Sequence, residues 1–303
     1  MRNQKTRKII GKRKEKEMKV LTNLLKFIFI IILTICMISL GIITIAFSTI
    51  LDKNYVIQEL DETNFYAETY ELVKSSFENY IYQSGLEEEV LNDICTEEKV
   101  KQDINIMLSN IYDGTNQKID TTEIANNLNA NIDKYGIKNK QNEGAINQFI
   151  EHICNEYINT LVHTKYEEQI NNVYEKVVET LNKLYQILLI VSVIDIIAII
   201  VINNKKISKD IQHLEIALFS TSIFELVVCQ IINSKIYIQG IKIFNDTFSK
   251  SVVTIIQDIL NKIVSLAVGT FILSLLVIII YVTIVAIKTS NKKDAIINDE
   301  TKE

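Results

Sequence analysis

Long apolar runs alternate with polar segments along this chain, and the length of those runs is the first constraint on its structure. A helix needs about 20 apolar residues to cross the hydrocarbon core of a bilayer. Four runs meet this length, and Lys26, at the edge of the first, is the only Lys or Arg in them. They are residues 25–50, 184–202, 211–233 and 264–287. The pattern therefore predicts an all-α integral membrane protein with four transmembrane helices.

Basic residues beside the runs predict the orientation. Residues 1–24 hold nine Lys and Arg against two acids, and the turn at 203–210 carries three lysines. Lys and Arg are enriched in short cytoplasmic segments, so we expect both termini in the cytoplasm of a cell-membrane protein. The first run is also much longer than the 7–15-residue core of a cleaved signal peptide. A retained signal anchor is therefore the favoured interpretation.

The predicted organisation alternates across the membrane, one segment after another. We expect a basic cytoplasmic N-terminus (1–24), the first span (25–50), an acidic helical extracytoplasmic domain (51–183), the second span (184–202), a cytoplasmic turn (203–210), the third span (211–233), an extracytoplasmic helical segment (234–263), the fourth span (264–287) and a cytoplasmic tail (288–303). The charge sign agrees with this assignment at residues 1–24 and at the turn 203–210.

The segment 51–183 is acidic, with 25 Asp and Glu against 11 Lys and a net charge of about −14. Its apolar residues nevertheless recur at helical spacing, as in one continuous stripe from Val56 to Tyr80, which predicts packed helices rather than disorder. Thr96, with two glutamates after it, is a typical helix start, and Gly114 and Gly136 are typical helix ends. From Gly144 the pattern predicts one long helix that continues into the second span.

Four cysteines fall into two groups. Cys36 and Cys229 lie in apolar runs, where cysteine behaves as a small apolar residue. Cys95 and Cys154 lie in the domain expected outside the cytoplasm, where a disulfide could form between them. The alternative interpretation is two buried free thiols on helical apolar stripes. Sequence spacing does not report the distance that a disulfide requires, so both interpretations stay open.

No motif for catalysis or for a cofactor is found in the sequence. Phosphate-binding glycine loops, HExxH, CxxC and GxSxG are all absent. His152 and Glu156 have the spacing of two metal ligands, but no third ligand accompanies them. We therefore expect a non-enzymatic protein without a cofactor or a metal. The basic N-terminus is suited to contact with membrane lipids, and nothing indicates a nucleic-acid partner.

Acidic residues inside the apolar runs are the sharpest anomaly. Asp195 lies near the middle of the second run and Glu225 near the middle of the third, with Glu215 near the cytoplasmic end of the third. A short turn joins these runs, so the first two acids should lie within about 10 Å in depth. Buried intramembrane acids serve as ion or proton sites, as polar locks to a partner helix, or as hydrogen-bonded packing residues.

Three functional hypotheses follow, and the first is our prediction. The absence of Pro and Trp is typical of an AT-rich bacterial genome. We predict a multi-pass protein of the bacterial envelope whose acidic domain binds or senses a partner. The layout of one span, a large outside domain and three spans resembles the topology of FtsX- and MacB-type permeases, which implies a separate ATPase partner. A homo-oligomeric ion or proton carrier that uses the intramembrane acids is the third hypothesis.

Overall fold

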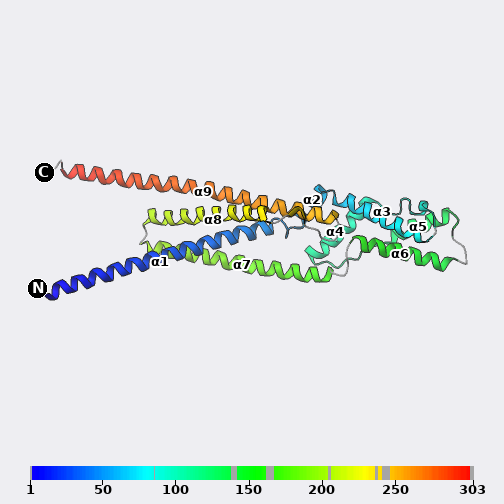
Figure 1. Cartoon of the computed structure of the whole chain (residues 1–303), viewed down its shortest axis with the longest axis horizontal. Coiled ribbons are helices and arrows are strands. Elements are labelled where there is room, and N and C mark those ends of the chain that lie inside the picture. Colours follow the sequence, from blue (N-terminus) through cyan, green and yellow to red (C-terminus); the bar gives the residue numbers. More distant parts are fainter. Residues whose placement is uncertain are drawn as a thin grey trace. The chain divides into compact units, whose positions relative to one another are not determined.

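The chain is all-helical in the part that the structure describes, with no strand (Figure 1). The computed structural model describes residues 2–84, 86–137, 142–161, 167–203, 206–235, 238–240 and 246–300. Its helices are α1 (Arg2–Phe47), α2 (Lys53–Glu62), α3 (Phe65–Ser84), α4 (Glu97–Asp113), α5 (Thr122–Lys134), α6 (Glu143–Leu161), α7 (Glu167–Ile202), α8 (Ile207–Lys235) and α9 (Asp246–Glu300). The described residues also form two short 3₁₀ helices, η1 (Glu88–Leu91) and η3 (Ile238–Gly240).

The chain divides into two compact units. The first, here called the membrane unit, comprises Met1–Ile45, Leu181–Tyr237 and Ile259–Glu303. The second, here called the helical domain, comprises Ala46–Thr180 and Ile238–Asp258. The membrane unit holds most of each apolar run, whereas the helical domain holds most of the acidic segment. The two units therefore separate the apolar part of the sequence from the acidic part.

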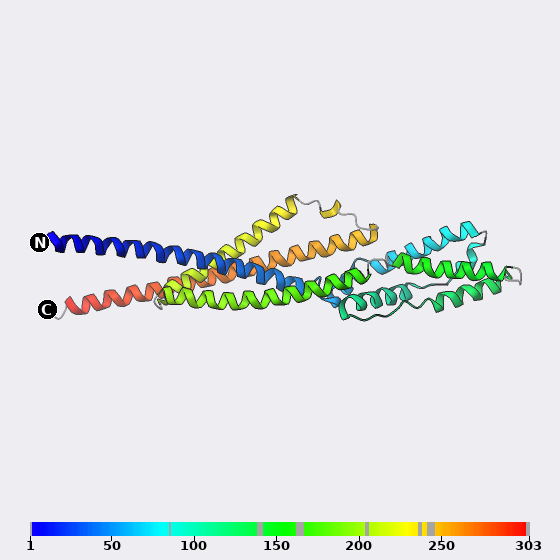
Figure 2. The same ribbon diagram turned by 90° about the horizontal axis from the view of Figure 1, so that it is seen from below.

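Four helices are long and apolar enough to cross a membrane: Lys16–Phe47 of α1, Asn172–Ile202 of α7, Ile207–Ser234 of α8 and Asp246–Ser290 of α9. The number of spans expected from the sequence is thereby confirmed. Within the membrane unit, α7 and α8 run nearly side by side in Figure 1, whereas Figure 2 shows α8 (yellow) at an angle to α7 (green). Many of their Ile, Leu, Val and Phe side chains are exposed, which suits a lipid environment and would be unfavourable in water.

The helical domain packs around its own apolar core. Helix α3 lies against α4 and α6, and α5 lies against α6 and η1. Buried positions recur one turn apart, as in Ile124, Leu128 and Ile132 of α5, which are all fully buried. This spacing places one apolar stripe of each helix toward the core. The helical packing expected from the sequence is therefore present in this segment.

Local capping explains where α4 and α5 end. The Thr96 hydroxyl accepts a hydrogen bond from the Lys99 backbone N–H at 3.2 Å, which satisfies an amide at the start of α4. Gly114 and Gly136 follow α4 and α5 closely, and each has φ of 66°. This left-handed conformation is strained for residues that carry a Cβ. The helix start and both helix ends expected from the sequence are confirmed.

One expected continuous helix is interrupted, and a second is described only in two parts. The apolar stripe from Val56 to Tyr80 divides into α2 and α3, and Asn64 between them has φ of 56°. Asparagine tolerates this left-handed conformation better than most residues, so the chain can turn there without glycine. The helix expected from Gly144 onward is described in two parts, α6 and α7. Residues 162–166 lie outside the described residues, and the sequence HTKYEEQ at 163–169 interrupts the apolar stripe.

Candidate functional site

The intramembrane acids of α7 and α8 lie inside the membrane unit. Asp195 and Glu225 are each only 3% exposed. Asp195 shares a buried stripe of α7 with Ile199 and Asn203, which lie one and two turns further along the helix. Both acids therefore face the interior of the unit rather than the surrounding lipid. Glu215 is half-buried and belongs to no hydrogen bond or ion pair among the described residues, so it is not part of this buried group.

One oxygen of each buried acid lacks a hydrogen-bond partner. Among the described residues, the buried side-chain atoms without a partner are Asp195 Oδ2, Glu225 Oε2, Ser274 Oγ and Asn203 Oδ1. An unsatisfied buried polar group costs about 1–3 kcal/mol, and more when it is charged. If the two acids were only packing residues, each carboxyl would be expected to form a hydrogen bond with a neighbouring helix. These two oxygens form no such bond within the described ranges.

The register of α7 and α8 is fixed at the turn that joins them. The Asn203 side-chain nitrogen donates to Asp210 Oδ1 at 2.8 Å and lies 3.1 Å from Nδ1 of His213. One turn away from this contact, Ile199 of α7 and Ala217 of α8 belong to one buried cluster. Continuing the antiparallel register places Asp195 and Glu225 about 6 Å apart in depth, one helical turn.

A glycine of α1 lies at the level of Glu225. A Cβ added to Gly41 would lie 3.4 Å from Glu225 Oε1 and 2.6 Å from Leu266 Cδ2. Helices α1, α8 and α9 therefore come together at this point because position 41 has no side chain. Small residues allow such close approaches between membrane helices. Gly41 was not predicted as a contact point, because its only signal in the sequence is a glycine in the middle of an apolar run.

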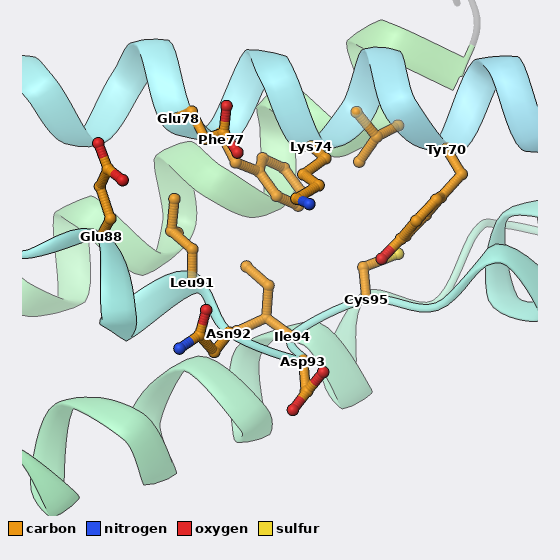
Figure 3. Close-up of a pocket in the computed structure, with 11 residues that line it drawn as sticks. Tyr70, Lys74, Phe77, Glu78, Glu88, Leu91, Asn92, Asp93, Ile94 and Cys95 are labelled. Carbon is orange, nitrogen blue, oxygen red and sulfur yellow. The ribbon is translucent and has the colours of Figure 1, made fainter.

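The helical domain contains an open cavity of about 280 Å³ (Figure 3). Helix α3, η1 and the segment that follows η1 form its walls. Its lining residues are Tyr70, Val73, Lys74, Phe77, Glu78, Glu88, Leu91, Asn92, Asp93, Ile94 and Cys95. Figure 3 shows the Lys74 side chain entering the cavity from α3, between its two ends. The Lys74 ammonium makes no ion pair with any described residue.

The cysteines of the helical domain are free thiols in this structure, rather than the disulfide that the sequence allows. Cys95 Sγ lies 3.6 Å from the Thr96 carbonyl, and Cys154 Sγ lies 3.9 Å from the Thr121 carbonyl. Both cysteines are buried in the domain core. Burial raises the pKa of the Cys95 thiol to about 11 and also raises that of Cys154.

His152 and Glu156, which have the spacing of two metal ligands in the sequence, take part in other contacts. Among the described side chains, no group of three or more His, Cys, Asp and Glu is placed to hold a metal ion. The His152 ring lies instead against Tyr80, with ring centroids 5.6 Å apart. Glu156 accepts a hydrogen bond from the Ser76 hydroxyl at 2.5 Å. These two residues therefore contribute to contacts between α3 and α6.

These features define an all-helical chain with four helices that could cross a membrane, as in a multi-pass membrane protein. Comparison with known proteins adds no relative, because no protein family, no curated protein and no solved structure matches this chain. The functional argument consequently depends on the residues themselves. Two places carry it: the cavity of the helical domain and the buried polar atoms of the membrane unit.

Proposed function

We propose that this chain is a non-enzymatic, multi-pass protein of the bacterial cell membrane whose acidic helical domain binds or senses a partner outside the cytoplasm. In this proposal both termini are cytoplasmic. The observation that carries it is the open cavity in the helical domain, which otherwise packs around its own apolar core. A separately packed domain between two membrane helices can present such a cavity to the envelope.

The chemistry of the cavity supports a small polar ligand or a protruding side chain of a partner protein. Its volume of about 280 Å³ is close to the lower end of the range for small-molecule sites, roughly 300–1,000 Å³. Glu78, Glu88 and Asp93 supply carboxylates, Lys74 supplies an ammonium, and Tyr70 adds an aromatic ring. Groups of both charge signs in one cavity favour a ligand that itself carries both signs.

The overall charge of the acidic segment favours a partner with a basic surface. A net charge of about −14 over residues 51–183 attracts cationic groups and repels acidic ones. A partnership with an ATPase at the cytoplasmic side has less support, because only residues 203–206 separate α7 from α8. Such a short connection leaves little surface for an ATPase to contact.

The orientation can be tested with single cysteines at two exposed positions, Glu151 of the helical domain and Lys206 of the turn. The four native cysteines are buried, so they give little background. A membrane-impermeant maleimide applied to intact cells should label the Glu151→Cys variant, whereas the Lys206→Cys variant should react only after lysis. The opposite pattern would refute the proposed function, because the helical domain would then be cytoplasmic.

Binding at the cavity can be tested with a photo-crosslinking amino acid. We expect a benzoylphenylalanine at Asn92, an exposed residue that lines the cavity, to give a crosslinked adduct in native membranes. The same amino acid at Glu151, which is exposed and does not line the cavity, is the matched control. The adduct at position 92 should weaken as salt is raised, because ions screen exposed charges such as those of Lys74, Glu78 and Glu88. Equal labelling at both positions, or none at either, would argue against a binding cavity.

A further inference from the structure

The four unpartnered polar atoms of the membrane unit lie at successive depths. Asn203 is level with His213 at the turn between α7 and α8. Asp195 is two turns before Asn203, on α7, and Glu225 is three turns after His213, on α8. At a rise of 1.5 Å per residue, Asp195 and Glu225 therefore lie about 12 and 18 Å from the turn. The fourth atom is Ser274 Oγ of α9, whose depth is derived next.

The depth of Ser274 follows from two contacts of α9. Leu266 lies against Gly41, at the level of Glu225, and Ser274 is two turns from Leu266. The rings of Phe219 and Phe271 lie 5.9 Å apart, which confirms that α9 runs antiparallel to α8 in this register. Ser274 is therefore about 6 Å from the turn, between Asn203 and Asp195. The order from the turn is Asn203, Ser274, Asp195 and Glu225.

These four side chains come from α7, α8, α9 and the turn that follows α7, and all are buried. Ser274 is fully buried, Asn203 is 2% exposed, and the two acids are 3% exposed. Buried residues of each helix face the interior of the bundle, so the four lie at successive levels of that interior, and this set is here called the polar column. Steps of about 6 Å are too long for a direct hydrogen bond. A proton that moves from one level to the next would therefore pass through at least one bridging water molecule.

The charges around the column decide which ligand suits the two acids. On α8, the titratable groups near the column are Asp210 and His213 at the turn, the half-buried Glu215, and Cys229 one turn beyond Glu225. On α1 the titratable group is Cys36. Residues 264–280 of α9 contain no titratable group. No Lys or Arg lies within the apolar runs except Lys26. An ionised carboxylate here would have no counter-charge, and its burial in an apolar environment is costly.

We propose that Asp195 and Glu225 form an intramembrane proton-binding site that exchanges protons with water at the α7–α8 turn, through Ser274 and Asn203. Each carboxylate takes up one proton and becomes a neutral carboxylic acid, with no change in oxidation state. A proton fits better than a metal cation, which requires several oxygen ligands. The described residues offer only two carboxylates here, on neighbouring levels.

A hydrophobic carbodiimide tests whether these acids are protonated inside the membrane. The O–H of a carboxylic acid adds across a C=N bond of dicyclohexylcarbodiimide, and the adduct rearranges to a stable acylurea that mass spectrometry locates. In proteoliposomes of the full chain, we expect labelling at Glu225 and Asp195 that declines as pH rises. Glu225→Gln and Asp195→Asn should each lose labelling at the changed position. Glu215→Gln, on the same helix but outside the column, should leave both signals unchanged.

The route is tested by setting the pH independently on the two sides of sealed proteoliposomes. Labelling of Glu225 should follow the pH on the side of the α7–α8 turn, and Ser274→Ala should slow that response without changing the final extent. The side of the turn is established by labelling a cysteine at Lys206. Labelling that follows the opposite side, or that Ser274→Ala does not slow, would overturn the route.

Two further outcomes would overturn the proton site itself. One is the absence of carbodiimide labelling at both acids over the whole pH range. The other is protection of both acids by sodium or potassium, compared with choline at the same ionic strength, which would show that the column binds an alkali cation. Labelling that is insensitive to these cations and lost at high pH supports the proposal.

Discussion

Tyr157 of α6 donates a hydrogen bond of 2.6 Å from its hydroxyl to Oδ2 of Asp103 on α4, in the core of the helical domain. Tyr157 is fully buried and Asp103 is 1% exposed. Lys99, one turn before Asp103, donates to both carboxylate oxygens at 2.7 and 2.8 Å. The buried charge of Asp103 is therefore paired and hydrogen-bonded, as a stable buried carboxylate must be.

We predict that removing Asp103 destabilises the protein far more than removing the Tyr157 hydroxyl. Asp103→Ala leaves the ammonium of Lys99 without its partner and should cost about 3–5 kcal/mol. Tyr157→Phe leaves the ion pair intact and should cost about 1–3 kcal/mol. Thermal unfolding of the purified chain in detergent measures both. Glu98→Ala, at an exposed position of α4, is the control and should change stability by less than about 0.5 kcal/mol. Equal losses for all three variants would refute this account.

Alkaline pH should destabilise the helical domain through its buried tyrosines. Burial raises the pKa of Tyr66 and of Tyr112 to about 12, from an ordinary value of 10.0. Burial, together with the hydrogen bond to Asp103, raises the pKa of Tyr157 as well. Because the unfolded chain releases these protons first, stability is fully present below pH 10 and declines as pH rises toward 12 and beyond.

Tyrosinate absorbance, recorded alongside helical circular dichroism, checks this pH dependence. The folded protein should show tyrosines that titrate only above the ordinary range, and some of them should titrate together with unfolding. Tyr157→Phe should reduce the slope of stability against pH above 10. If every tyrosine titrated near pH 10 while the helices remained intact, the burial of these hydroxyls would be disproved.

We predict that all four cysteines are reduced and unreactive in the folded protein. Each is buried, and burial raises the pKa of Cys95 to about 11, so little reactive thiolate is present at neutral pH. A maleimide should modify none of them in mild detergent and all four after denaturation. Prior reduction should make no difference to that result. Recovery of a Cys95–Cys154 crosslinked peptide without reductant would show instead that the domain holds a disulfide.

The features that could be predicted from the sequence depend on local chemistry. The length of each apolar run was enough to find the four membrane helices, and Thr96 and Gly114 mark the ends of α4 through their own backbone and hydroxyl preferences. Contacts between distant residues were not predictable. Asp103 and Tyr157 are 54 positions apart, and nothing in their spacing pairs them.

The polar column shows the same limit within the membrane unit. Asp195 and Glu225 could be singled out because acids are rare in membrane helices. Ser274 could not, since a serine in an apolar run is common and acquires meaning only when its depth and burial are known. The break at Asn64 was also missed, because asparagine only weakly indicates a left-handed turn.

The close approach of α1, α8 and α9 predicts that Gly41 tolerates no large side chain. Gly41→Val would place atoms against Leu266 Cδ2, since even a Cβ would lie 2.6 Å from it, and overpacking of this kind costs about 1–3 kcal/mol. Leu266→Ala in the same chain should recover part of the loss, which a double-mutant cycle of thermal unfolding in detergent measures. Gly269→Val is the matched control, because nothing lies within 4 Å of a Cβ at Gly269. Similar losses at both glycines would mean that the three helices do not meet at Gly41.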